Sequence, residues 1–87
     1  MVDKRIEELQ KFLEKNQNRE ILVLFDGFIN SKIKFKNMSF NINLDVLEIK
    51  NDAEHISINL NQIYNIEFNK NEVRMYLDND LIINLLV

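Results

Sequence analysis

The sequence predicts an α+β fold in which an N-terminal helix packs on a strongly bent antiparallel sheet or a small barrel of six to seven strands. Apolar residues recur with a helical period only near the N-terminus. From residue 20 onward they alternate with polar residues, and turn-forming clusters recur every eight to twelve residues. No second helical segment is available to connect parallel strands, so we expect an antiparallel meander over residues 20–87. The chain is interpreted as a single domain, residues 1–87, and sequence leaves barrel, sandwich and open bent sheet as alternatives.

The helix is predicted over residues 3–16. Ile6, Leu9 and Leu13 fall on one face of this segment, and Phe12 widens the apolar stripe. Asp3 is the candidate N-cap. We expect this helix to pack on the sheet rather than to bind a partner on its own.

The apolar run Ile21–Phe25 predicts the first strand, and because both of its alternate faces are apolar we expect it to be buried on both sides. The nearly all-apolar segment Leu81–Val87 is its expected equal and neighbour. Asp26 and Gly27 predict a two-residue type I′ hairpin turn, which requires a positive φ at both positions. A second strand would then begin at Phe28.

Shorter alternating segments predict the remaining strands. They cover residues 32–36, 40–45, 56–60, 64–68 and 72–77, and residues 46–50 either prolong one strand or form a neighbour. Ile63 falls on the opposite face from Leu60, which predicts a bend or one 3₁₀ turn between them. Polar clusters predict turns at residues 51–54, 69–71 and 78–80.

No residue pattern points to catalysis, a cofactor or a metal, so we expect a protein that is not an enzyme. The chain has no Cys and one Gly, which removes thiolate metal sites and Gly-rich phosphate-binding loops. His55, the single histidine, is expected to be a solvated loop residue near Asp52 and Glu54. Asp78-Asn79-Asp80 begins like a calcium loop, but Ile83 stands where that loop needs glycine, so a hairpin turn is expected.

Two sets of charged residues are candidates for binding a partner. Lys32, Lys34 and Lys36 have the spacing that places three ammonium groups on one face of a strand. Such lysines either guard an edge strand, remain solvated, or contact an acidic protein or an RNA backbone. The second set comes from the acidic C-terminal half and could dock on a basic protein; it comprises Asp52, Glu54, Glu67, Glu72, Asp78 and Asp80. Tyr76 is a separate aromatic candidate for anchoring an interface or stacking a base.

One segment resembles a known family. The stretch from Phe40 to Asp45 is similar to the hydrophobic-Asn-hydrophobic-x-Leu-acid stretch of Sm-like proteins, with Asn37 at the position usually held by Asp. This resemblance implies a bent antiparallel sheet that binds RNA. The bend at Gln62–Ile66 is similar to one found among pleckstrin-like folds.

The sequence therefore favours a small non-enzymatic protein-interaction domain that binds and occludes a protein partner. Frequent Asn, Ile and Lys indicate an AT-rich genome, which is compatible with a phage-borne or bacterial inhibitor or immunity-type protein. The alternative is an Sm-like RNA-binding module, although a net charge of −3 disfavours general nucleic-acid binding. Self-association through an exposed strand is compatible with the first interpretation. The absence of Cys and of a signal-peptide pattern predicts a cytoplasmic location without a membrane partner.

Overall fold

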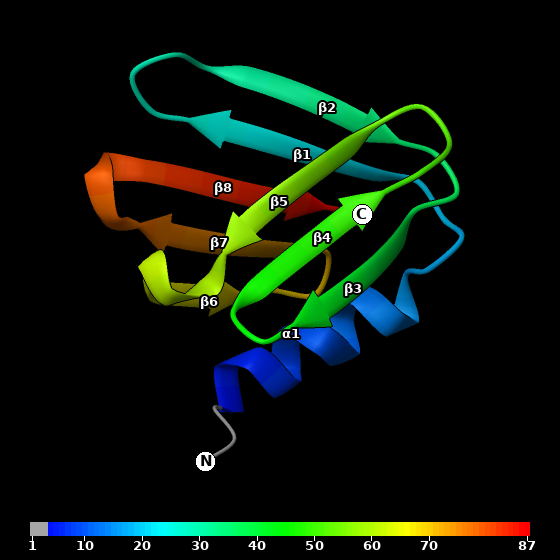
Figure 1. The fold of residues 1–87 in the computed structure, drawn as a ribbon, viewed down its shortest axis with the longest axis horizontal. Coiled ribbons are helices and arrows are strands. Elements are labelled where there is room, and N and C mark those ends of the chain that lie inside the picture. Colours follow the sequence, from blue (N-terminus) through cyan, green and yellow to red (C-terminus); the bar gives the residue numbers. More distant parts are fainter. Residues whose placement is uncertain (1–3) are drawn as a thin grey trace.

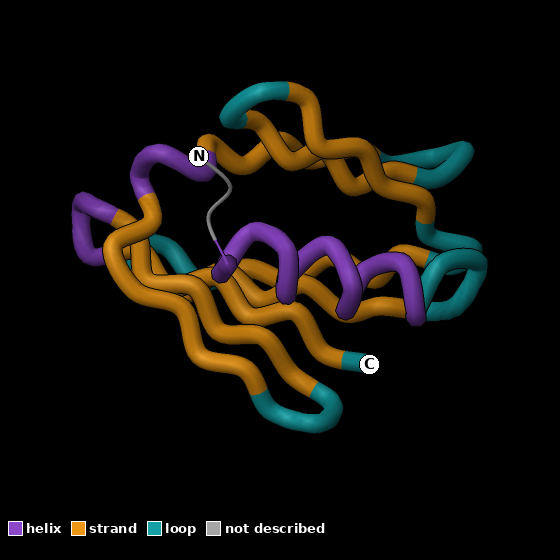
Figure 2. Tube along the Cα trace, turned by 90° about the horizontal axis from the view of Figure 1, so that it is seen from below, coloured by secondary structure: helices purple, strands orange, loops and turns teal. Residues whose placement is uncertain are grey.

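Two antiparallel sheets face each other, and the single helix lies at the open side between them (Figures 1 and 2). The computed structural model describes residues 4–87. The elements follow in this order: α1 (Lys4–Lys15), β1 (Ile21–Asp26), β2 (Ser31–Phe35), β3 (Ser39–Asn43), β4 (Val46–Lys50), β5 (His55–Asn59), η1 (Leu60–Gln62), β6 (Ile63–Phe68), β7 (Glu72–Leu77), η2 (Asp78–Asp80) and β8 (Leu81–Leu86). The five-stranded sheet has the order β2-β1-β8-β7-β6, and the three-stranded sheet has the order β3-β4-β5.

The predicted α+β class is confirmed, but the strands number eight rather than six or seven and the sheets do not close into a barrel. The extra strand arises because residues 46–50 form a separate strand, β4, that pairs with β3, which is one of the two alternatives that the sequence left open. Leu44 turns the chain there with a φ of 56°. This left-handed conformation favours Gly or Asn, so a leucine gives no turn signal in the sequence.

The helix matches its prediction within one residue at each end. Leu9 and Leu13 are fully buried, and Ile6 and Phe12 pack against the same core. These residues share one face of α1. The helix lies between the two sheets, so this face points into the space that they enclose. The candidate N-cap Asp3 lies outside the described residues.

Two asparagines end the helix and direct the chain into the sheet. The side chain of Asn16 is almost fully buried and donates a hydrogen bond of 2.8 Å to the carbonyl oxygen of Phe12. Asn18 adopts a φ of 63°, and its N–H donates to the carbonyl oxygen of Met38 at 2.9 Å. The helix terminus is thereby fixed to the segment that connects β2 and β3.

The strand β1 is confirmed, but only one of its faces is fully buried. Ile21 and Val23 have no exposed surface, whereas Leu22 and Leu24 point outward and are half-buried. The expectation of burial on both sides was therefore wrong, because no element within residues 4–87 covers the outward face of the five-stranded sheet. The predicted neighbour is correct, since β1 pairs with β8 along its length.

The β1–β2 connection is longer than the predicted two-residue turn. Phe25 is paired with Ser31, so β2 begins three residues later than expected. Gly27 does not adopt a positive φ, which excludes a type I′ turn at Asp26-Gly27. Instead the N–H of Gly27 donates to the side-chain oxygen of Asn30 at 3.2 Å, which closes a wider loop.

The core fills the space between the two sheets and the helix. β4 and β5 contribute Leu47, Ile49 and Ile58 from the three-stranded sheet. The predicted 3₁₀ turn is confirmed as η1, where the Asn59 side chain accepts the N–H of Asn61 and Leu60 is buried. The buried apolar residues are Leu9, Leu13, Ile21, Val23, Phe35, Met38, Leu47, Ile49, Ile58, Leu60, Val73, Met75, Leu77, Ile83 and Leu85.

Candidate protein-interaction surface

The tip of the β1–β2 hairpin carries two adjacent large apolar side chains that are strongly exposed. Phe28 is fully exposed and Ile29 is 74% exposed. The other five phenylalanines of the chain are all buried or half-buried. Burying a phenylalanine side chain stabilises a fold by about 1.5–3 kcal/mol, and Phe28 contributes none of this to the isolated chain. Two adjacent apolar residues on a hairpin tip are therefore available for contact with another molecule.

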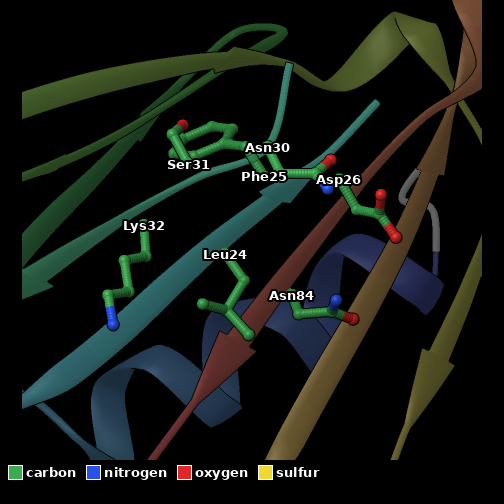
Figure 3. A pocket seen from close by; sticks show the side chains of 7 residues that line it. All are labelled: Leu24, Phe25, Asp26, Asn30, Ser31, Lys32 and Asn84. Atoms are coloured by element: carbon green, nitrogen blue, oxygen red, sulfur yellow. The ribbon is translucent and has the colours of Figure 1, made fainter. Parts of the chain in front are cut away.

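An open hollow of about 450 Å³ lies between this tip and the sheet. Figure 3 shows its side chains, which come from β1, β2, β8 and the β1–β2 loop. Leu24 supplies the apolar floor, and Lys32 and Asn84 flank it in one cross-strand row. The lining residues are Leu24, Phe25, Asp26, Asn30, Ser31, Lys32 and Asn84.

An acidic turn lies beside the hairpin tip at the same end of the sheet (Figure 1). A Cβ atom at Gly27 would lie 3.2 Å from Leu81 Cδ1 and 3.8 Å from the carbonyl oxygen of Asp80, so the β1–β2 loop and η2 are in contact. The side chains of Asp78 and Asp80 are exposed there, as is that of Asp26 at the end of β1. Within residues 4–87 no group of three or more His, Cys, Asp or Glu side chains could hold a metal ion.

The outward face of the five-stranded sheet is arranged in cross-strand rows. One row crosses all five strands and runs Lys32, Leu24, Asn84, Arg74, Glu67. It is basic at the β2 edge, apolar near its centre and acidic at the β6 edge. The charge of this face thus changes sign from one edge of the sheet to the other.

Polar contacts link the residues at the acidic side of this face. Tyr76 Oη donates to Glu67 Oε1 at 2.5 Å, and Arg74 Nε donates to Asn84 Oδ1 at 3.0 Å. Arg74 Nη2 lies 3.8 Å from Glu72 Oε1. A hydrogen bond with Tyr76 and the negative charge of Glu72 raise the pKa of Arg74 above its ordinary value. Arg74 therefore stays charged and holds these side chains in one network.

The structure separates the predicted site residues into four places. Lys32 and Lys34 face outward on β2, and Lys34 lies 3.6 Å from Glu20. Lys36 follows the end of β2 and lines a different hollow with Asn51 and Asp52. Glu67, Glu72 and Tyr76 come together across β6 and β7, whereas Asp78 and Asp80 lie in η2.

Sequence reasoning missed the two exposed residues of the hairpin tip. Phe28 was assigned to the second strand, because Asp26-Gly27 was interpreted as a complete turn. The available signal was the run from Gly27 to Ser31, in which two apolar residues stand between a glycine and the turn-forming pair Asn30-Ser31.

His55 lies at the start of β5 and faces outward from the three-stranded sheet. Its Nε2 atom is 3.5 Å from Glu48 Oε2 and 3.5 Å from Ser57 Oγ. A serine–histidine–acid relay needs the acid and the serine on different ring nitrogens, but here both approach the same atom. This exposed group of side chains does not have the geometry of a nucleophilic catalytic site.

Comparison with protein-family models, with curated proteins and with solved structures finds no match to this chain. Neither the Sm-like nor the pleckstrin-like resemblance gains support from these comparisons. Across residues 4–87, the one α-helix falls short of the length and apolar character that crossing a membrane would require.

Proposed function

We propose that this chain is a non-enzymatic protein-interaction domain of the inhibitor type, which occludes a protein partner by inserting the β1–β2 tip. The observation that carries the proposal is the exposure of Phe28 and Ile29 on a loop whose base is fixed by β1 and β2. A rigid aromatic anchor loses little conformational entropy when it is buried in a partner. The lack of Cys supports a cytoplasmic location as part of this proposal, and the AT-rich residue usage supports a phage or bacterial source.

The charges beside the tip define the chemistry of the partner. Asp26, Asp78 and Asp80 place three exposed carboxylates at the end of the sheet that carries Phe28. The complementary surface is an apolar pocket with a basic rim, because opposite charges steer the encounter while the apolar contact supplies affinity. Nucleic-acid-binding proteins are one class with such basic surfaces.

The proposal is tested with a photo-reactive amino acid placed at position 28 or, as the control, at position 44. Leu44 is 89% exposed on a hairpin turn of the other sheet, so the two positions match in exposure and setting. In cells of the source organism, we expect one protein to be cross-linked from position 28 and not from position 44. The captured protein, once purified, should bind the wild-type chain with a Kd that rises about 30-fold for Phe28→Ala.

Three outcomes would contradict the proposal. Equal cross-linking from both positions would show that the tip makes no specific contact. If no protein were cross-linked from either position, the tip would have no protein partner. The third outcome is recovery of RNA, with binding that weakens steeply as salt increases and is lost when Lys32, Lys34 and Lys36 are replaced by Glu. That result would favour the alternative RNA-binding function.

A further inference from the structure

The two sheets differ in what they present to solvent. In the three-stranded sheet, whose strands are all described, Val46 is the one aliphatic residue on the outward face. Its other outward residues are Ser39, Asn41, Asn43, Glu48, Lys50, His55, Ser57 and Asn59. Antiparallel sheets with one solvated face carry polar residues on that face, and this sheet follows the rule.

The five-stranded sheet breaks this rule at its centre. Leu22 and Leu24 of β1 lie next to Ile82 and Leu86 of β8 on the outward face. All four are half-buried by their neighbours in the sheet, and none of the described helices and strands covers them. Because the same chain keeps its other outward face polar, the aliphatic centre is a surface suited to being covered.

Charge complementarity identifies what covers it. β8 is the middle strand of the sheet, with two strands on each side. The edge strand β2 presents Lys32 and Lys34, whereas β6 and β7 present Glu67 and Glu72. The net charges on the two sides of β8 are therefore opposite in sign, with Asp26 of β1 at the end of the basic side and Arg74 held among the acidic residues by its contacts to Glu72 and Asn84.

Consider a twofold axis that runs parallel to β8 and lies above the outward face. It would place the basic side of one copy over the acidic side of a second copy. The axis places β2 opposite β6 of a second copy, so Lys32 lies opposite Glu67 of that copy, because both belong to one cross-strand row. A twofold axis in the same plane but perpendicular to the strands would instead place lysines opposite lysines. We propose that the outward face of the five-stranded sheet binds a second copy of this chain in an isologous dimer with its axis along β8.

The residues of β8 fit this arrangement because each lies opposite its own counterpart. Ile82 and Leu86 form apolar self-contacts, and two sheets packed face to face are separated by about 10 Å, a spacing that aliphatic side chains fill. Asn84 lies between them in the strand. An amide both donates and accepts hydrogen bonds, so Asn84 can pair with the same amide of the second copy and define the register.

The dimer also has a consequence for the hairpin tips, which rests on the proposed function. An axis parallel to the strands leaves both copies pointing in the same direction, so the two Phe28 tips emerge from the same end of the dimer. Such a dimer would present two copies of the partner-binding element to one target, and the second contact would form at a high effective concentration.

The test measures the dimer constant by sedimentation equilibrium, without any partner, for a charge-reversal cycle. The wild-type chain should dimerise with a Kd below about 100 µM, and Lys32→Glu and Glu67→Lys should each raise it about tenfold. The double variant K32E/E67K should restore dimerisation to within about threefold of wild type, because each reversed charge again faces its opposite in the other copy. Lys50→Glu makes the same charge change on the other sheet and should leave the Kd unchanged.

Leu86→Glu provides an independent variant, since the axis along β8 places this carboxylate opposite its own counterpart in the second copy, and it should leave the chain monomeric. Circular dichroism checks that each variant is folded. The proposal is overturned if wild type stays monomeric at about 100 µM, or if the double variant dimerises no better than the weaker single variant. The proposal is also overturned if the chain forms a dimer whose Kd is unchanged in all of these variants. That result would indicate that the two copies pair through their edge strands. Phe28→Ala should not alter the dimer, so failure here is distinct from failure of the proposed function.

Discussion

Lys32 and Glu67 lie in one cross-strand row at opposite edges of the five-stranded sheet, separated by Leu24, Asn84 and Arg74. Within one copy they cannot meet, because three strands stand between them. In the proposed dimer, the twofold axis along the central strand would place Lys32 opposite Glu67 of the second copy. The basis for the proposed dimer is that Lys32 and Glu67 are too far apart to form an ion pair within one copy but would face each other between two copies.

Two adjacent leucines of β8 should differ strongly in their contribution to stability. Leu85 is fully buried between the sheets, whereas Leu86 faces outward and is half-buried. We expect Leu85→Ala to lower the free energy of unfolding by about 2–5 kcal/mol and Leu86→Ala by about 1 kcal/mol or less in dilute solution. Urea denaturation of the two variants measures both values. Equal losses would contradict the assignment of inward and outward faces.

The helix terminus should tolerate glycine but not alanine at position 18. Asn18 has a φ of 63°, a conformation that an alanine adopts at a cost of about 1–2 kcal/mol. Asn18→Ala should therefore lower the melting temperature, whereas Asn18→Gly should leave it unchanged or raise it slightly. If both variants behaved alike in a thermal scan, the left-handed conformation of Asn18 would be wrong.

The single glycine should be replaceable at little cost. The φ of Gly27 is not positive, and the one tight contact of an added Cβ would be with the flexible end of the Leu81 side chain, at 3.2 Å. We expect Gly27→Ala to change the free energy of unfolding by less than about 1 kcal/mol. A larger loss in chemical denaturation would support the type I′ turn that the sequence predicted and the structure lacks.

The β3–β4 turn should be stabilised by a change at its leucine. Leu44 combines a φ of 56° with 89% exposure, so it contributes strain without packing. Relief of the left-handed strain outweighs the extra flexibility of glycine in the unfolded chain, and Leu44→Gly should gain about 0.5–1 kcal/mol. Differential scanning calorimetry would show this as a higher melting temperature, and a lower one would count against the turn geometry.

Hydrophobic periodicity predicted most of the architecture because it reports burial directly. The helix and the turn at η1 follow from the spacing of apolar residues, and the β1–β8 pairing was expected because these two segments are the nearly all-apolar runs of the chain. The two-sheet arrangement does not, since alternation shows which residues face inward but not which strands pair. The sequence leaves the turn at Leu44 as one of two alternatives, because its conformation is imposed by the surrounding hairpin rather than by the residue type.

The candidate surfaces were predicted only in part. The lysines and acids were found from their spacing, but their relation across β8 depends on a strand order that sequence does not define. The apolar run of β1 was interpreted as a strand buried on both faces. In the structure, the face that carries Leu22 and Leu24 is not covered by any of the described helices or strands. An exposed apolar residue has the same sequence signature as a buried one, which is why Phe28 was assigned to a strand.

Calorimetric titration of the purified partner with matched tip variants tests the central claim most directly. Phe28→Ala removes the aromatic anchor, and Leu44→Ala removes an equally exposed apolar side chain from the other sheet. The account predicts that Phe28→Ala weakens binding about 30-fold, while Leu44→Ala changes the Kd by less than about twofold. An unchanged Kd for Phe28→Ala, with the fold intact, would contradict it.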